Sequence, residues 1–491
     1  MSLPATTPNP IEPQAAQYVW LPQPGPQWFA VNSDIDEVFF GGTRGGGKSD
    51  ALLGRHLIGA QAYKHAWNGL ILRRKYKDFA ELRRRIDELI RAGLEAERIG
   101  GENQVNHLRF ANGATVTLAA MMRLEMANDW VGHQFTEISI DEATKIPFYA
   151  ALVDQMWGCL RSPAGVPCRL FATGNPGGPG HGQVKARYIE IDGQRWPPRH
   201  PYRDPVTGTT RVFWPSRLQD NVALIDADPQ YARRLQSITD PVLRAAWLDG
   251  DWDVVLDAAF TIVPDWHVCD PVPVPESAPL YMTYDWGFGK PFSIGWWWID
   301  ADGRVYRFAE WYGWTGAADV GLRLADSDVA QGILEREAEW SITGRPITRL
   351  AGNDCFCRKP NTQQGGQSPS TAEVFARYGI ALKPGNPDRV AKIRQFRERL
   401  RLPKDEQGRV IERPMMVIYR TCKQFLRTVP QLCLDEANPE DVDTAQEDHV
   451  YDEAALLALA RPLTSFDTRL APGAPGQTSG TIHGARTGEV Y

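Results

Sequence analysis

Apolar runs and amphipathic segments alternate through the first half of the chain. Residues 38–42 form an apolar run that enters a glycine-rich stretch, which predicts a buried strand followed by a helix from about residue 50. A second strand is predicted over 69–74, and residues 77–92 carry apolar side chains at helical spacing. Alternation over 105–118 around Asn112-Gly113 predicts a hairpin. Strands that alternate with helices indicate an α/β fold with a mainly parallel sheet.

Two further predicted strands, at 135–143 and 169–176, end in polar residues. The carboxyl ends of parallel strands meet at one edge of a sheet, so these polar ends are expected on the same side as the glycine-rich stretch. Glu137 and Ser139 interrupt the apolar run expected of a buried central strand.

The glycine-rich stretch has the spacing of a phosphate-binding loop. Glycine, four residues, glycine, lysine and serine occupy positions 42 to 49, where backbone N–H groups and a helix N-terminus can converge on a triphosphate. Lys48 is expected at the β/γ-phosphates and Ser49 at Mg²⁺. The predicted nucleotide-binding residues here are Gly42, Thr43, Arg44, Gly45, Gly46, Gly47, Lys48 and Ser49.

Three residues around this loop each have two interpretations. Arg44 either senses the γ-phosphate or is a solvated loop residue. Gln27 either reads adenine with its amide, which both donates and accepts, or is a surface glutamine. Asn175, with Thr173, either senses the γ-phosphate or belongs to a simple turn before two glycines.

An acidic pair ends the strand at 135–143. Asp141 is expected to hold Mg²⁺ directly or through water. Glu142 is expected to orient and deprotonate the attacking water, which makes it the predicted catalytic residue of ATP hydrolysis.

The second half of the chain has a different order of elements. Three strands at 280–287, 292–299 and 304–311 form a predicted antiparallel meander, followed by a helix at 316–338 and a strand at 347–351. Further helices and a strand at 415–419 complete an order that is typical of an RNase H-like nuclease with a mixed sheet.

Carboxylates lie where such a nuclease needs them. Asp285 ends the first strand, Asp354 follows the fourth, and Asp452 lies on the last helix, one helical turn after His449. Three converging carboxylates can hold two Mg²⁺ or Mn²⁺ ions. Asp443 and Asp448 are alternative third ligands, and each aspartate taken alone is also typical of a turn or a surface.

Length and composition add limits to this picture. A chain of 491 residues suggests two or three domains, and 43% hydrophobic with 23% charged residues is typical of a soluble globular protein. No apolar run is long enough for a membrane span, and the start of the chain lacks a signal-peptide pattern. The net charge of −6 still permits DNA binding through a local basic surface.

These observations predict five segments. They are a flexible arm at 1–19, a P-loop ATPase domain at 20–252, a proline-rich linker at 253–279, an RNase H-like nuclease domain at 280–464 and a disordered tail at 465–491.

The motif order resembles the large terminase subunit of tailed bacteriophages. In that family an adenine-reading glutamine, a phosphate loop, an Asp-Glu strand and a coupling motif occur in this order, and Gln27, residues 42–49, Asp141-Glu142 and residues 173–175 match them. The Asp-His-x-x-Asp stretch at 448–452 matches the nuclease half. The family also uses an arginine finger, for which Arg123 is a candidate.

The resemblance implies an ATPase that drives double-stranded DNA into a procapsid and a nuclease that cuts concatemeric DNA. It implies ATP and Mg²⁺ as cofactors, with Mn²⁺ possible at the nuclease site. The implied partners are DNA, a small terminase subunit, the capsid portal protein and further copies of the chain in a ring, with no membrane. The implied location is the host cytoplasm and, transiently, the procapsid portal, but not the mature virion.

Two other functions fit parts of the pattern. A cellular helicase or repair translocase fused to a nuclease should carry further helicase motifs between the two halves, and the sequence has none. A non-cutting, ATP-dependent DNA-binding scaffold would use the aspartates structurally, and cleavage assays would distinguish it.

Overall fold

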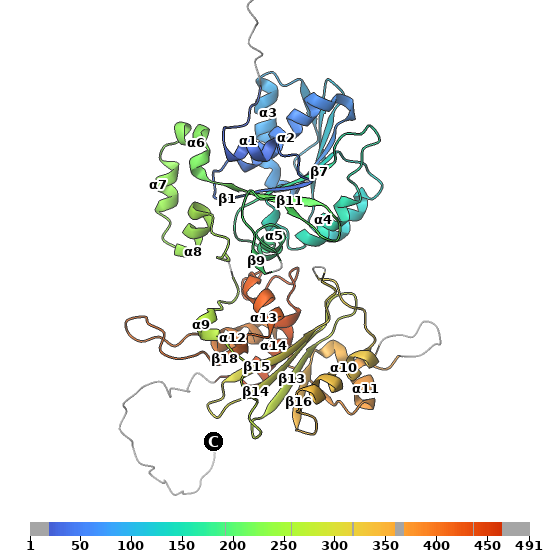
Figure 1. Cartoon of the computed structure of the whole chain (residues 1–491), viewed down its shortest axis with the longest axis vertical. Coiled ribbons are helices and arrows are strands. Elements are labelled where there is room, and N and C mark those ends of the chain that lie inside the picture. The colour runs from blue at the N-terminus through green and yellow to red at the C-terminus, as the bar shows by residue number, and fades with distance from the viewer. Residues whose placement is uncertain are drawn as a thin grey trace, which may run out of the picture.

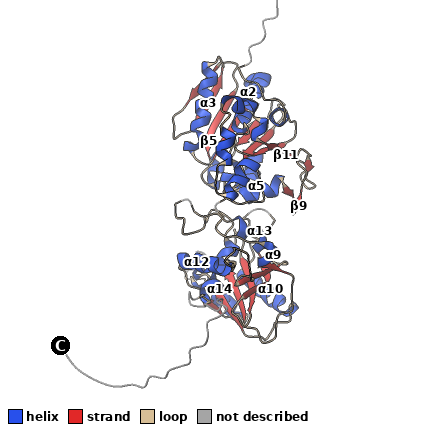
Figure 2. Ribbon diagram, turned by 90° about the vertical axis from the view of Figure 1, so that its left-hand side faces the viewer, coloured by secondary structure: helices blue, strands red, loops and turns tan. Residues whose placement is uncertain are grey.

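The computed structural model describes residues 19–463 except 192, 257, 317–318, 359–367 and 436. The described chain forms two lobes, each with its own large sheet (Figures 1 and 2). The predicted arm, apart from residue 19, and the predicted tail lie outside the described residues. Within the described ranges, no helix is long and apolar enough to cross a lipid bilayer.

The first lobe is built on a nine-stranded sheet. Its central pairs are parallel, and antiparallel strands stand at both edges. In sheet order the strands are β10 (Tyr202–Arg203), β11 (Thr210–Ser216), β1 (Glu37–Gly42), β7 (Arg169–Gly174), β6 (Glu137–Ile140), β2 (Asn68–Arg73), β5 (Thr115–Ala120), β4 (Asn106–Phe110) and β3 (Ala96–Ile99). A separate small hairpin pairs β8 (Glu190–Ile191) with β9 (Gln194–Arg195).

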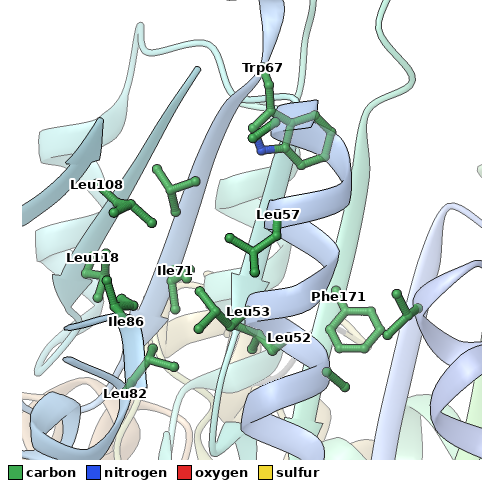
Figure 3. Close-up of a cluster of buried hydrophobic side chains, with 14 of the residues drawn as sticks. Leu52, Leu53, Leu57, Trp67, Ile71, Leu82, Ile86, Leu108, Leu118 and Phe171 are labelled. Atoms are coloured by element: carbon green, nitrogen blue, oxygen red, sulfur yellow. The ribbon is translucent and has the colours of Figure 1, made fainter. Parts of the chain in front are cut away.

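Helices cover this sheet and bury its apolar faces. Figure 3 shows Leu52, Leu53 and Leu57 on one face of α2, between Ile71 of β2 and Phe171 of β7. The helices of this lobe are α1 (Pro26–Val31), α2 (Lys48–Tyr63), α3 (Ala80–Arg91), α4 (Tyr149–Trp157), α5 (His181–Tyr188), α6 (Val222–Ala227), α7 (Tyr231–Gln236) and α8 (Pro241–Arg244).

Buried polar pairs explain the two polar residues of β6. Arg55 of α2 forms a buried ion pair with Glu137, and Arg55 Nη2 donates to Glu137 Oε2 over 3.2 Å. His56 Nε2 lies 2.9 Å from the hydroxyl of Ser139. A central strand can therefore carry both residues because α2 supplies a partner for each.

The second lobe is built on a seven-stranded mixed sheet. The β13–β14 and β14–β15 pairs are antiparallel, and the remaining pairs are parallel. In sheet order the strands are β12 (Val268–Cys269), β18 (Met416–Tyr419), β15 (Val305–Tyr312), β14 (Ser293–Ile299), β13 (Leu280–Asp285), β16 (Ile347–Ala351) and β17 (Leu382–Pro384). The predicted fold class, a mainly parallel first sheet and a mixed second sheet, is confirmed.

Two separate cores lie on opposite faces of the second sheet. Trp297 of β14 packs in the core that includes α14, whereas Trp296 and Trp298 pack in the core that includes α10, as alternation along a strand requires. The helices of this lobe are α9 (Pro264–His267), α10 (Asp326–Glu339), α11 (Thr371–Arg377), α12 (Arg389–Leu400), α13 (Lys423–Thr428) and α14 (His449–Ala460).

Candidate functional site

The glycine-rich loop lies between the end of β1 and the start of α2, over the end of β11. A Cβ atom on Gly46 would meet Ser216 Oγ at 1.9 Å, so a larger residue there requires the Ser216 side chain or the loop to move. Gly45 and Gly47 have φ of 75° and 74°, the left-handed conformation that glycine adopts without strain. A cavity of about 290 Å³ opens at this loop, lined by residues 44–50 together with Asn175 and Tyr231.

Lys48 is buried at the floor of this loop. Its ammonium donates to the backbone oxygen of Thr43. Burial lowers the pKa of Lys48 to about 8, although the charge of Asp141 acts in the opposite direction. An anionic ligand in the cavity would stabilise this buried cation.

Asp141 collects hydrogen bonds from three elements. Its Oδ1 accepts from the hydroxyl of Thr173, from Ser49 Oγ at 3.4 Å and from the backbone N–H of Glu142 at 3.0 Å. Its Oδ2 accepts from Arg73 Nε at 2.9 Å and from Arg73 Nη2. Burial alone would raise the pKa of Asp141, but Arg73 and the hydrogen bonds hold that pKa below its ordinary value.

The two residues predicted to hold Mg²⁺, Ser49 and Asp141, are therefore brought together. Arg73, a cation in direct contact with this carboxylate, was not predicted as a functional residue. It ends β2, which lies beside β6 in the sheet. The sequence contains no local signal for this pairing, because the order of the strands decides it.

Glu142 follows Asp141 in a left-handed conformation, with φ of 55°. Such a backbone conformation is unusual for a residue with a side chain and occurs at functional sites. Its carboxylate contacts the Lys145 ammonium at 2.8 Å and is one-third exposed. Its charge acts on both Lys48 and Arg73.

The residues with two interpretations are placed as follows. Asn175 lines the cavity and donates from Nδ2 to the backbone oxygen of Gly42 at 2.7 Å. Arg44 is exposed, with its guanidinium 3.4 Å from the ring centroid of Trp247. Arg123 is exposed at the start of a 3₁₀ helix.

Gln27 is 4% exposed, so the interpretation as a surface glutamine is wrong. Its Nε2 donates to the backbone oxygen of Gly47 at 3.0 Å, and its Oε1 accepts from the backbone N–H of Gln23 at 2.5 Å. In this arrangement Nε2 contacts the glycine-rich loop and Oε1 contacts the backbone before α1, and adenine reading stays a prediction.

A second group of acidic residues lies at the end of β13. Asp285 Oδ2 is 3.2 Å from Nδ1 of His449, the first residue of α14. Burial raises the pKa of Asp285 to about 6; contact with His449 opposes the rise, and the charges of Asp452 and Asp354 add to it. The two other predicted nuclease carboxylates, Asp354 and Asp452, are thus close enough to act on Asp285.

An arginine and a histidine contact these carboxylates. Arg389 of α12 lies 3.4 Å from Asp452. Hydrogen bonds to Asp285 and Asp319 raise the pKa of His449 to about 10, against the effect of burial. Across the described ranges, no three or more His, Cys, Asp or Glu side chains are placed as a preformed metal cage.

The alternative ligands Asp443 and Asp448 differ in position. Asp448 is buried, and burial together with the charge of Asp452 raises its pKa well above its ordinary value. Asp443 instead lies 3.8 Å from Arg74 of the first lobe. Of the carboxylates near Asp285, Asp448 is buried, whereas Asp285 and Asp452 are partly exposed and Asp354 is exposed.

Asp319 is a member of this group that was not predicted. Its Oδ1 lies 3.0 Å from His449 Nε2, and its Oδ2 lies 3.0 Å from Lys290 Nζ. Its φ of 58° is left-handed. The residue falls within a predicted helix over 316–338, whereas α10 begins only at Asp326.

Solved structures of phage large terminases are similar to this chain. The large terminase of a thermophilic bacteriophage, in complex with ADP, is 17% identical, covering 88% of this chain and 98% of that chain, with a TM-score of 0.36. The large terminase of bacteriophage HK97 is 11% identical, covering 88% of this chain and 93% of that chain, with a TM-score of 0.38.

The nuclease domain of the P22 large terminase is 16% identical, covering 42% of this chain and 92% of that chain, with a TM-score of 0.30. No protein-family model matches the sequence. No curated protein matches it.

Proposed function

We propose that the chain is the large terminase subunit of a tailed bacteriophage, a DNA-packaging ATPase with a metal-dependent nuclease. The observation that carries the proposal is the placement of Ser49 and Asp141 side by side at a glycine-rich loop with a buried lysine. The acidic residues gathered around Asp285, of which Asp448 is buried, support the second activity.

In the first lobe, residues 42–49 hold the triphosphate of ATP, with Lys48 at the β- and γ-phosphates. Ser49 and Asp141 hold Mg²⁺, which would offset the negative charge of the phosphoryl oxygens. Glu142 orients the attacking water and accepts its proton. Asn175 connects the end of β7 to the loop through Gly42, which supports a role in sensing the γ-phosphate.

In the second lobe, Asp285, Asp354 and Asp452 hold divalent cations, with Asp448 beside them. Mg²⁺ or Mn²⁺ held there would activate a water and stabilise the leaving 3′ oxygen of DNA. His449 orients Asp285 through its Nδ1 contact. Arg389 contacts Asp452, His449 contacts Asp285, and Lys290 contacts Asp319.

Together the two activities suit the packaging of viral DNA. ATP hydrolysis would move double-stranded DNA into a procapsid, and the nuclease would cut concatemers at the start and end of packaging. Several copies of the chain would form a ring on the capsid portal and act together with a small terminase subunit. It would be found in the host cytoplasm and only transiently at the procapsid.

The first test is DNA-stimulated ATP hydrolysis by the full chain and by Lys48→Ala. We expect hydrolysis that DNA stimulates in the wild type and loss of that hydrolysis in the variant. No hydrolysis by the wild type, or equal hydrolysis by both, would contradict the motor.

The second test is plasmid cleavage in Mg²⁺ or Mn²⁺ by the wild type and by Asp285→Ala. We expect cleavage by the wild type alone. Equal cleavage by both proteins, or none by either, would favour the non-cutting scaffold.

A further inference from the structure

A fully buried ion pair lies directly behind the acidic cluster. Arg307 of β15 and Glu453 of α14 both have side chains with 0% exposure, and Arg307 Nη1 contacts both carboxylate oxygens of Glu453, with Oε2 at 3.0 Å. Thr283 Oγ1 donates to Glu453 Oε1 at 3.1 Å, and Trp297 Nε1 donates to Thr283 Oγ1 at 2.8 Å. One carboxylate therefore connects β15, α14 and β13.

The residues of this network are adjacent to the acidic cluster along the chain. Glu453 follows Asp452 and comes one helical turn after His449. Thr283 precedes Asp285 by two residues in β13, so both side chains lie on the face that meets α14. A shift of α14 along β13 would break the contact of Glu453 with Thr283 and move His449 from Asp285.

The sheet has a space made for this ion pair. A Cβ atom on Gly295 of β14 would meet Glu453 Oε1 at 2.2 Å and Arg307 Nη1 at 2.3 Å. Gly295 pairs with Thr283 on one side and with Glu310 on the other. Glycine at this position lets two charged side chains cross the middle strand.

The network also reaches α13. Arg307 Nε lies 3.4 Å from Glu310 Oε2. Glu310 accepts hydrogen bonds from the backbone N–H groups of Gln424 at 2.5 Å and Phe425 at 3.1 Å, in the first turn of α13. One guanidinium is thus connected to α14 directly through Glu453 and to the first turn of α13 through Glu310.

Stability does not explain this arrangement well. A buried ion pair costs desolvation energy, and hydrophobic residues of similar volume often give equal or greater stability. What the pair provides is one defined position of α14 relative to β13, because its hydrogen bonds are directional.

We propose that Arg307 and Glu453 are positioning residues of the nuclease site, which hold α14 so that Asp452 and His449 face Asp285. This inference rests on the proposed nuclease function. Neither residue touches the substrate, and both act through the placement of α14.

The test replaces the pair by apolar residues in the full chain, as Arg307→Met with Glu453→Leu. The matched control is Arg349→Met with Glu337→Leu, a partly buried pair of the same lobe with 2.6 Å between Nη2 and Oε2 that joins β16 to α10. Thermal melting and initial rates of plasmid cleavage are measured over a range of Mn²⁺ concentrations.

We expect the Arg307/Glu453 double variant to melt no earlier than the control variant. Its cleavage should fall, or its Mn²⁺ requirement should rise, by about 10- to 100-fold, the range typical for loss of groups that orient metal ligands. The control variant should cleave as the wild type does. Cleavage by the double variant at the wild-type rate and with the wild-type Mn²⁺ requirement would overturn the inference.

A second variant serves if the double variant does not fold. Glu453→Gln keeps the volume of the side chain and its contact with Thr283, so it should fold and show a smaller rise in the Mn²⁺ requirement. An unchanged requirement would overturn the inference. If the wild type itself cleaves no DNA, the proposed nuclease function fails and the inference fails with it. If the wild type cleaves DNA and the variants cleave equally well, only the inference fails.

Discussion

Arg73 and Asp141 form a buried ion pair beside Ser49, just after the glycine-rich loop. Arg73 donates hydrogen bonds to Oδ2 of Asp141. Thr173, Ser49 and the backbone N–H of Glu142 donate to Oδ1. The carboxylate expected to hold Mg²⁺ therefore already has a cationic partner supplied by the neighbouring strand.

Substitution of Arg73 should make the stability of the first lobe depend on Mg²⁺ and nucleotide. Arg73→Gln leaves Asp141 buried without its partner, which typically costs about 3–5 kcal/mol. Mg²⁺ with ADP should restore more stability to this variant than to the wild type, because the metal replaces the missing charge. Thermal melting with and without Mg²⁺·ADP checks this, and an equal increase in both proteins would contradict it.

Gly46→Ala should abolish nucleotide binding by displacing the loop, since the new Cβ would meet Ser216 Oγ. Adding Ser216→Ala removes that oxygen and leaves the Ser216 Cβ at 3.2 Å, so binding should return at least in part. Fluorescent ATP-analogue titration measures the effect. Gly289→Ala is the control, because a Cβ there meets nothing within 4 Å. Failure of the second substitution to restore any binding would show that the contact is not the cause.

Glu142→Gln should separate binding from hydrolysis. Loss of a general base typically lowers the rate by about 10²- to 10⁴-fold, while the phosphate contacts of the loop stay intact. Single-turnover hydrolysis and ATP affinity are measured together, with Lys145→Met as the control because it removes only the ion-pair partner of Glu142. A hydrolysis rate equal to that of the wild type would exclude Glu142 as the base.

Asp448→Asn and Asp443→Asn should behave differently. Asp448 is buried beside Asp452 and Asp285, so its neutral amide should raise the stability of the metal-free protein and lower DNA cleavage. Asp443→Asn removes a charge near Arg74 and should leave cleavage close to wild type. Melting with and without Mn²⁺, together with plasmid cleavage, checks this; the reverse ranking of cleavage would make Asp443 the ligand.

Stability of the first lobe should fall on acidification below pH 6.5. Burial lowers the pKa of His56 to about 3 and that of His181 to about 4, from 6.5 in an unfolded chain. Between pH 6.5 and about 4 the unfolded chain therefore binds protons that the folded lobe does not, and each histidine contributes a slope of up to about 1.4 kcal/mol per pH unit.

His56→Gln should reduce the dependence of the unfolding free energy on pH by the contribution of one histidine. Urea unfolding at pH 7, 6 and 5 measures it for both proteins. The same decrease in stability in wild type and variant would show that His56 does not carry the effect.

Local sequence patterns were sufficient for most strands that lead to the sites. The apolar run before the glycine-rich loop became β1, and the Asn112-Gly113 turn joins β4 to β5 as predicted. Residues 196–220 have only weak periodicity in the sequence, yet they contain β11, which pairs with β1. Pro215 argues against a strand in the sequence, because proline is rare inside a sheet. It is tolerated here because β10 pairs only with residues 210 and 211 of β11, so Pro215 lies beyond that pairing.

Contacts distant in sequence could not be predicted in this way. The predicted helix over 316–338 starts late because Gly321 lies against the backbone of residues 288–290, where its N–H donates to Gly289 O at 2.8 Å. That close approach puts Asp319 on a loop beside His449. The partnership of Arg73 with Asp141 likewise depends on the order of strands, which no local pattern encodes.

The three consecutive tryptophans of β14 have a consequence for how the second lobe can evolve. Trp297 packs in the core next to α14, and Trp296 and Trp298 pack in the core next to α10 and α11. The strand therefore separates these two cores. Sequence drift in α10 and α11 can therefore be absorbed around Trp296 and Trp298. Asp285 and α14 lie on the other side of the sheet from these contacts, whereas Asp354 precedes Cys355 of the α10 core and would be affected by them.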